Sequence, residues 1–251
     1  RLVRQPTAAE DCVARTATGW PNQSLESVDT VVHLAGENLA NGRWSPSRKA
    51  RIRGSRVDGT RRLAEQLAHL EHPPRTLLCA SAIGIYGDRG TTSVDETASP
   101  GHDFLAGVCE GWEQATRPAA DAGIRVVHLR FGIVLTPGGG ALGRMVPPFL
   151  VGAGGRLGSG RQMMSWIALD DVLGAVLHTM ATPTLDGPVN VVAPEAVDNR
   201  TFTRTLGTVL RRPTMFPVPA GAMRLLFGEM ADALLLSGAH VRPAALLRSG
   251  F

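Results

Sequence analysis

The stretch from Arg75 to Asp88, RTLLCASAIGIYGD, decides the fold. It opens with a short apolar run, 76–80, which is too brief for a helix and predicts a buried strand. Small residues follow at once, and Ser81 and Tyr86 each add a hydroxyl. Ligands of open parallel sheets bind just beyond the carboxyl ends of the strands, so we expect a site here. The alternative is a tight turn whose glycines only relieve steric crowding.

Strands and helices alternate on both sides of this stretch, which predicts a parallel sheet flanked by helices. Ser45 followed by Pro46 is typical of a helix start, and Asp170 or Asp171 is expected to cap a later helix. The sequence predicts strands at 1–4, 30–34, 125–129 with an extension to 135, and 188–193, and helices at 45–69, 103–122, 170–180, 201–210 and 220–236.

Composition bounds the function. A chain of 251 residues can bury one core, or one core with a small lobe. Its formal charge of +4 comes from scattered arginines, with no basic run interleaved with aromatics, so a nucleic-acid role is not supported. The three cysteines, Cys12, Cys79 and Cys109, form no CxxC pair. This excludes a disulfide framework and a zinc site, and it fits a reducing cytoplasm. No apolar stretch is long enough for a membrane span.

Several segments resemble the extended short-chain dehydrogenase/reductases, the NAD-dependent epimerase/dehydratase superfamily. The stretch ASAIGIYG is similar to the family's Ser-Ser-x-x-x-Tyr-Gly segment. Four more segments follow in family order: VVHLAGEN (31–38), SRVDGTRRLAEQL (55–67), VVHLRFGIVL (126–135) and WIALDDV (166–172). The strings GENL, RW, DFL, WE, GGGALGRM and GSGRQ resemble an atypical, epimerase-like subfamily.

The resemblance implies an α/β fold, a doubly wound parallel-sheet Rossmann domain with a smaller α/β lobe. Residues 1–136, with a returning strand near 188–193, would form the NAD(P)-binding domain. Residues 137–187 and 194–251 would form a substrate lobe and a C-terminal domain of unknown function. In that family a first strand and its Gly-x-x-Gly-x-x-Gly turn should precede the segment RLVR at 1–4.

The cofactor expected from this resemblance is NADP, with NAD as the alternative. A dinucleotide fold selects NADP with an arginine after its second strand, and Arg4 stands there. The alternative is a solvated surface arginine. The other cofactor contacts that the resemblance implies are Leu34, Ala35, Gly36, Glu37, Arg56, Ser81, Arg130 and Gly132.

The catalytic pair of the resembled family is missing. The chain has one tyrosine, Tyr86, and its single lysine is Lys49, so no Tyr-x-x-x-Lys exists. Alignment on Trp112-Glu113 puts Leu105 and Cys109 in those two places. We expect Ser81 and Tyr86 to be the catalytic residues, with both hydroxyls in one pocket. Two alternatives remain open: the carboxylate of Glu37 beside Asn38, and the thiol of Cys109, which is also a common small core residue.

Substrate contacts are expected in and around two glycine-rich runs, 138–140 and 152–160. The second run follows no strand and leads to no helix, so we reject a phosphate loop and expect both runs to form loops that floor the substrate pocket. Polar side chains nearby could grip a polar, even anionic, substrate: Arg144 and Trp166, then Arg161 and Gln162, with Asn38 from the earlier loop.

Three functions follow as hypotheses. The first is an NADP-binding, epimerase-like oxidoreductase in the cytoplasm that acts on a small polar molecule. The second is a sensor that binds NADPH without turning it over, and the third is a nucleotide-sugar epimerase or dehydratase. The apolar segment 220–236 is expected to be core or a homodimer contact. No metal site, nucleic-acid partner or membrane contact is expected.

Overall fold

The computed structural model describes residues 2–3, 13–14 and 25–251. Two short strands, β1 (Leu2–Val3) and β2 (Val13–Ala14), pair in parallel. Arg4, expected to select NADP, and Cys12 lie outside the described residues.

Four parallel strands form the central sheet in the order β10-β6-β4-β3. They are β3 (Thr30–His33), β4 (Thr76–Ala82), β6 (Arg125–Phe131) and β10 (Gly187–Val191). This confirms the expected parallel sheet and the strand at 76–80, which runs two residues further. In the register, Ser81 of β4 lies beside Arg130 of β6.

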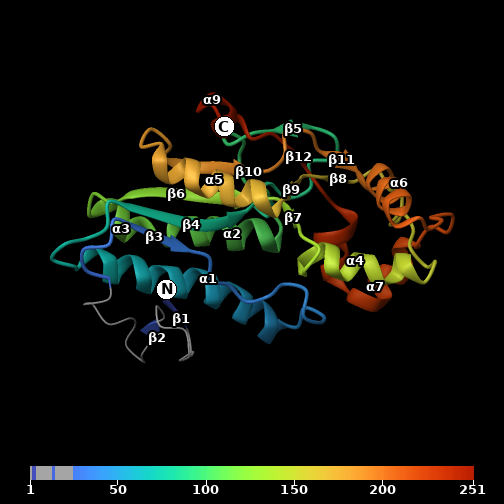
Figure 1. Cartoon of the computed structure of the whole chain (residues 1–251). Coiled ribbons are helices and arrows are strands. Elements are labelled where there is room, and N and C mark those ends of the chain that lie inside the picture. The colour runs from blue at the N-terminus through green and yellow to red at the C-terminus, as the bar shows by residue number, and fades with distance from the viewer. Residues whose placement is uncertain (1, 4–12, 15–24) are drawn as a thin grey trace.

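Helices cover both faces of this sheet (Figure 1). On one face lie α1 (Pro46–Ala68), α2 (Phe104–Gln114) and α3 (Arg117–Asp121), and on the other lies α5 (Leu169–Ala181). Successive side chains of a strand point to opposite faces, so Leu77 packs with Leu63 of α1 while Leu78 packs with Ala175 of α5. The sheet is therefore buried on both sides, as a doubly wound fold requires.

Helix ends follow the local sequence. The hydroxyl of Ser45 accepts a hydrogen bond from the backbone N–H of Arg48 at 3.2 Å, which confirms the predicted start of α1. The helix expected at 103–122 is instead two helices, because Pro118 lacks an N–H and cannot continue α2. Asp170 and Asp171, which were expected to cap α5, lie inside its first turn. Their negative charge interacts favourably with the positive end of the helix dipole there.

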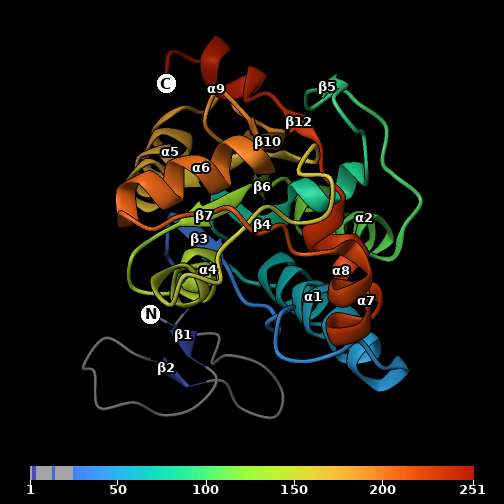
Figure 2. The same cartoon turned by 90° about the vertical axis from the view of Figure 1, so that its right-hand side faces the viewer.

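The smaller lobe lies beyond the strand ends (Figures 1 and 2). It contains α4 (Gly140–Leu150), α6 (Asn199–Leu210), α7 (Ala220–Phe227), α8 (Glu229–Ala231) and the π-turn η3 (Asp232–Leu236). Its short strand pairs are β7 (Ile133–Leu135) with β9 (Trp166–Ala168), and β8 (Met163–Met164) with β11 (Val197–Asp198). The chain then returns through β12 (His240–Val241), which pairs with β5 (Ser93–Val94), and ends in α9 (Ala244–Arg248).

Two expectations for this lobe were wrong. The glycine run 138–140 does not form a loop throughout, since α4 begins at Gly140. The single helix expected at 220–236 is divided at Gly228, whose φ of 61° breaks the helical backbone.

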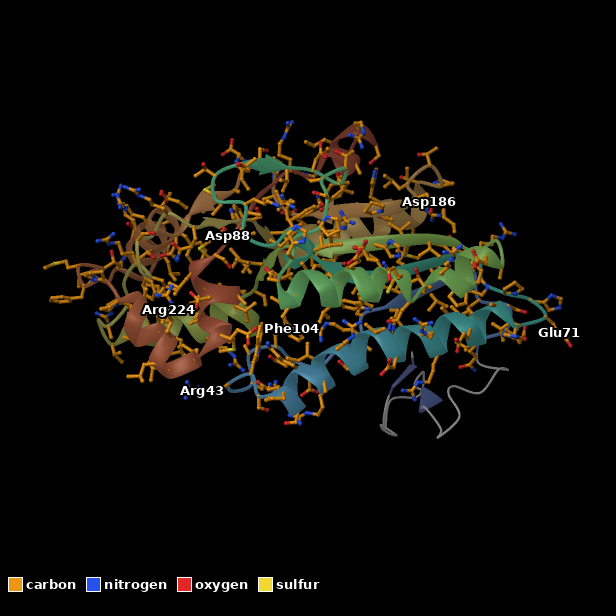
Figure 3. The ribbon with its side chains drawn as sticks, turned by 180° about the vertical axis from the view of Figure 1, so that it is seen from behind. Arg43, Glu71, Asp88, Phe104, Asp186 and Arg224 are labelled. Atoms are coloured by element: carbon orange, nitrogen blue, oxygen red, sulfur yellow. The ribbon has the colours of Figure 1, made fainter. Side chains whose placement is uncertain are left out.

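The lobe packs on the carboxyl-end side of the sheet. In Figure 3, Asp88 after β4 lies toward the lobe, as do Arg43 and Arg224. Glu71, which precedes β4, and Asp186, which precedes β10, lie at the opposite end. Among the described residues, no helix is long and apolar enough to span a membrane.

Candidate functional site

A cavity of about 490 Å³ lies between the carboxyl ends of the central strands and the lobe. Its strand-end wall consists of Leu34, the residues 80–84 and the residues 131–134. Helix α2 contributes Leu105, Val108, Cys109 and Trp112, and the lobe contributes Met163, Ser165, Ala233, Leu234 and residues 237–239. This is the place at which an open parallel sheet binds its ligand.

Ser81 lies near the carboxyl end of β4 in the cavity wall. Its hydroxyl is held by the ion pair of Glu113 and Arg130. Its hydroxyl donates to Oε1 of Glu113 at 2.7 Å. The same carboxylate takes two hydrogen bonds from Arg130, Nε to Oε1 at 2.8 Å and Nη2 to Oε2 at 2.9 Å. Burial, which alone would lower the pKa of Arg130, is outweighed by the hydrogen bonds and charge of Glu113, so that pKa is raised. The Arg130 guanidinium therefore stays charged, and its two hydrogen bonds hold the Glu113 carboxylate that accepts from Ser81.

Arg130 was expected to contact the cofactor, but it does not line the cavity. Besides Glu113, its Nη1 donates to the hydroxyl of Tyr86 at 2.9 Å. The guanidinium is thus committed to groups inside the protein.

Tyr86 was expected beside Ser81 in one pocket, and the structure does not bring the two hydroxyls together there. Tyr86 is 1% exposed and lies outside the cavity wall. Its hydroxyl donates to Oδ1 of Asn190 at 2.7 Å. Burial raises the pKa of Tyr86, and the charge of Arg130 only partly opposes this. The Tyr86 hydroxyl therefore has a structural role, because it hydrogen-bonds to Asn190 and Arg130 inside the protein.

Arg56 lies in the cavity wall, but its guanidinium is occupied. Its Nη1 donates to the backbone oxygens of Glu37 at 3.0 Å and Ile52 at 3.4 Å. The guanidinium also stacks on the ring of Trp112, 5.0 Å from its centroid. Burial lowers the pKa of Arg56. A Cβ at Gly36 would lie 3.1 Å from this guanidinium, so a small residue there lets Arg56 close over the loop.

The loop after β3 turns its polar groups toward α1 and its own backbone. The carboxylate of Glu37 faces Arg48 at 3.5 Å, and Oδ1 of Asn38 accepts the N–H of Ala40 at 2.8 Å. Of the four expected contacts at 34–37, only Leu34 lines the cavity.

The positions of the missing catalytic pair do line the cavity. Leu105 is apolar, and Cys109 carries a thiol whose pKa burial and the charge of Glu113 raise to about 12. A thiol with that pKa is almost entirely protonated near neutral pH, so it is a poor nucleophile.

Gly132, an expected cofactor contact, has no room for a side chain, because a Cβ there would lie 2.6 Å from the backbone oxygen of Ser165.

The expected substrate contacts also lie elsewhere. Arg144 donates to the backbone oxygen of Ala40 at 2.6 Å and to Oδ1 of Asn41 at 2.7 Å, which ties α4 to the loop after β3. The amide of Gln162 donates to the backbone oxygen of Leu235 at 2.8 Å. Trp166 and the glycine runs are not part of the cavity wall. The expectation that these glycines floor the pocket was wrong.

Glu113 is the site residue that the sequence interpretation missed. Glu113 served only to align the family's motif, although the spacing of residues on its helix could have indicated its role. Leu105, Cys109 and Glu113 follow one another at intervals of four residues, which places them on one face of a helix. A carboxylate on the face that lines a cavity needs a partner, and Arg130 on the adjacent strand provides it.

Sequence comparisons agree with this architecture. Residues 18–192 match the NAD dependent epimerase/dehydratase family, and residues 218–251 match a domain of unknown function, DUF1731. The chain is 46% identical over 253 residues to the epimerase family protein Mb2239 of Mycobacterium bovis, covering 100% of this chain and 83% of that protein. It is 35% identical over 230 residues to human epimerase family protein SDR39U1, covering 90% and 78%.

Among solved structures, human SDR39U1 (isoform 2) with NADPH superposes with a TM-score of 0.90 at 31% identity, covering 100% of this chain and 84% of that one. MoeE5 in complex with UDP-glucuronic acid and NAD superposes with a TM-score of 0.72 at 20% identity, covering 95% and 84%, and shares the fold. The parallel sheet, the cavity at its carboxyl ends and the match over 18–192 lead to one conclusion: this chain belongs to the NAD-dependent epimerase/dehydratase family, within the extended short-chain dehydrogenase/reductases.

Proposed function

We propose that this protein is an NADP(H)-binding oxidoreductase that transfers a hydride to or from a small molecule held beside Ser81. The observation that carries the proposal is the position of Ser81, which lies one residue before the end of β4 in the cavity wall and whose hydroxyl donates to Glu113. Support for the cofactor comes from the human relative, whose structure contains NADPH. We further propose that residues 137–187 and 194–251, apart from α5 on the face of the sheet, provide the substrate wall.

The residues present fit the nicotinamide end of such a cofactor. The strand-end wall is made of small and apolar residues with one hydroxyl, which suits a flat, uncharged ring. Among the described residues that line the whole cavity, the only cation is Arg56, from α1. The described residues therefore account for the nicotinamide end, and the phosphates of the cofactor need further partners. When bound, the cofactor would donate or accept the hydride.

Ser81 and its partners would handle the substrate oxygen. The hydroxyl can turn its hydrogen from Glu113 toward a carbonyl oxygen on which negative charge develops. Glu113 stays satisfied while this happens, because Arg130 holds both of its oxygens. Since Arg130 also neutralises that carboxylate, the developing charge does not face an unpaired anion.

A spectrophotometric assay tests this proposal. The full-length protein is loaded with NADPH and supplied with uncharged aldehydes and ketones, and the absorbance of NADPH is followed. We expect oxidation that requires the protein and that falls in Ser81→Ala. Ser93→Ala, an exposed serine of β5, is the matched control and should react like the native protein. Oxidation that is equal in Ser81→Ala would contradict the role of Ser81.

A second candidate is a protein that binds NADPH without catalysis. The specific observation in its favour is that the cavity has Leu105 and Cys109 where the resembled family has its tyrosine and lysine. NADPH that binds but is never oxidised by any carbonyl compound would favour this candidate over the first.

A further inference from the structure

The lobe wall of the cavity is lined mainly by apolar side chains. Its apolar contributors are Met163, Ala233, Leu234 and Ala239. Ser165 and Ser237 also belong to this wall, and their hydroxyls donate to the backbone oxygens of Ala239 at 2.8 Å and Ala233 at 3.3 Å. Helix α2 extends this surface with Leu105 and Val108, and both belong to a cluster of apolar side chains that joins α1, α2 and α8. A ligand between these walls would be surrounded mainly by carbon atoms.

Charged side chains in the cavity wall already have partners. Within residues 25–251, Arg56 and Asp103 are the charged groups of this wall. Arg56 is bound to two backbone oxygens and stacked on a ring, as described above. Asp103 accepts the N–H of Ala106 at 2.8 Å and so caps α2.

Three arginines near the cavity also have partners within the protein. Arg144 binds the loop after β3, and Arg130 binds Glu113. Arg89 donates to the backbone oxygens of Tyr86 at 2.8 Å and Ser99 at 2.6 Å. A phosphate or carboxylate at the lobe wall would therefore lose its water without gaining a free cation from the described residues that line the cavity, which is costly.

We infer that the substrate is an uncharged, largely hydrocarbon ketone or aldehyde, or the corresponding alcohol, whose single oxygen reaches Ser81. This inference rests on the proposed function and gives it a substrate class. It replaces the anionic substrate expected from Arg144, and it disfavours a nucleotide sugar.

The reaction is balanced with NADPH as the reductant. One hydride, which contains two electrons, passes to the carbonyl carbon, and the π bond of the C=O breaks. The oxygen takes one proton from water, so the products are an alcohol, NADP⁺ and a hydroxide ion that the buffer neutralises. Ser81 hydrogen-bonds to this oxygen throughout.

The test uses a matched pair of ketones on the NADPH-loaded, full-length protein. 2-Octanone and 7-oxooctanoate have the same chain and carbonyl, and they differ by a carboxylate at the far end. UDP-glucose is the third probe. Binding is measured by calorimetry, and turnover by the loss of NADPH absorbance.

We expect saturable binding of 2-octanone, at least about tenfold weaker binding of 7-oxooctanoate, and none of UDP-glucose. Equal or tighter binding of the charged ketone, saturable binding of UDP-glucose, or no binding of 2-octanone would each overturn the inference. Failure of the protein to bind NADPH at all would instead overturn the proposed function, so the two failures are distinguishable.

Two variants test whether 2-octanone binds in this cavity. Leu234→Glu places a charge in the half-buried lobe wall, and we expect it to weaken 2-octanone binding at least about tenfold. Leu225→Glu, on a side chain of the same lobe that is 77% exposed, should leave binding unchanged. Equal affinity of both variants for 2-octanone would place the ketone outside this cavity.

Discussion

The two walls of the cavity differ in what stands behind them. Behind the strand-end wall lies a connected set of buried polar groups, in which Ser81, Glu113, Arg130 and Tyr86 are joined by hydrogen bonds of 2.7–2.9 Å. The lobe wall presents apolar side chains such as Leu234, and its buried Ser165 hydrogen-bonds to the backbone of Ala239 and Val241 rather than to charged side chains. Of the four residues in the connected polar set, only Ser81 lines the cavity.

The difference shows how this fold separates positioning from recognition. A buried ion pair is costly to desolvate, but once formed it holds its neighbours in one geometry. The strand-end wall is therefore rigid and fixes one oxygen, whereas the lobe wall selects by shape and apolar contact. Changes behind the first wall should reduce stability and turnover, and changes in the second should alter the choice of substrate.

The largest effect is expected from Glu113→Gln. The change leaves the Arg130 guanidinium buried without its anion, and breaking a buried pair in this way costs about 3–5 kcal/mol of unfolding free energy. Chemical denaturation measures it. Glu110→Gln, an exposed glutamate of the same helix, should change stability by less than about 0.5 kcal/mol. Similar values for both variants would mean that the pair does not organise this wall.

Ser81→Ala is expected to come next. It removes the hydroxyl that faces the substrate oxygen, so turnover should fall about 100-fold, equivalent to roughly 2.7 kcal/mol. The affinity for NADPH should not change. Steady-state kinetics with a ketone that the native protein reduces, together with NADPH titration, gives both numbers. Turnover within twofold of native would remove Ser81 from the mechanism.

Tyr86→Phe tests whether the Tyr86 hydroxyl contributes to stability or to turnover. Loss of the phenol hydroxyl leaves the Asn190 oxygen and one Arg130 nitrogen without a partner, which costs about 1–3 kcal/mol. Turnover of the folded variant should match that of the native protein. A variant of native stability with greatly reduced turnover would restore the catalytic role first expected for Tyr86.

The smallest effect near neutral pH is expected at Cys109. Its pKa is about 12 in the folded protein against an ordinary 9.0, so the unfolded chain loses the proton first. The contribution to stability is therefore complete below about pH 9 and declines as the pH rises toward 12. Denaturation between those values should show a shallower pH slope for Cys109→Ala than for the native protein. Identical slopes would mean that the thiol titrates normally.

Much of the fold could be predicted because local patterns were strong. Short apolar runs gave β3, β4, β6 and β10, and the serine and proline at 45–46 gave the start of α1. The divided helices were less accessible. Pro118 and Gly228 stand inside apolar periodic segments, and single residues of this kind can either be tolerated or end a helix, depending on packing.

The site was harder to predict because its contacts are long-range. Ser81 could be located from its strand end, but its partner Glu113 is 32 residues further along the chain. Tyr86 looked close to Ser81 in sequence, yet the turn after β4 sends its hydroxyl to Asn190, 104 residues away. Arg144 and Arg56 looked free for a ligand because sequence does not reveal which arginines backbone oxygens already bind.

The most direct test of the central claim, that this protein binds NADP(H), is calorimetric titration of the full-length protein with NADPH and with NADH. We predict saturable binding of NADPH and binding of NADH that is at least about tenfold weaker, since the sequence predicts that Arg4 pairs with the 2′-phosphate of NADP. Binding of neither dinucleotide would contradict the claim and would leave a Rossmann scaffold with another ligand.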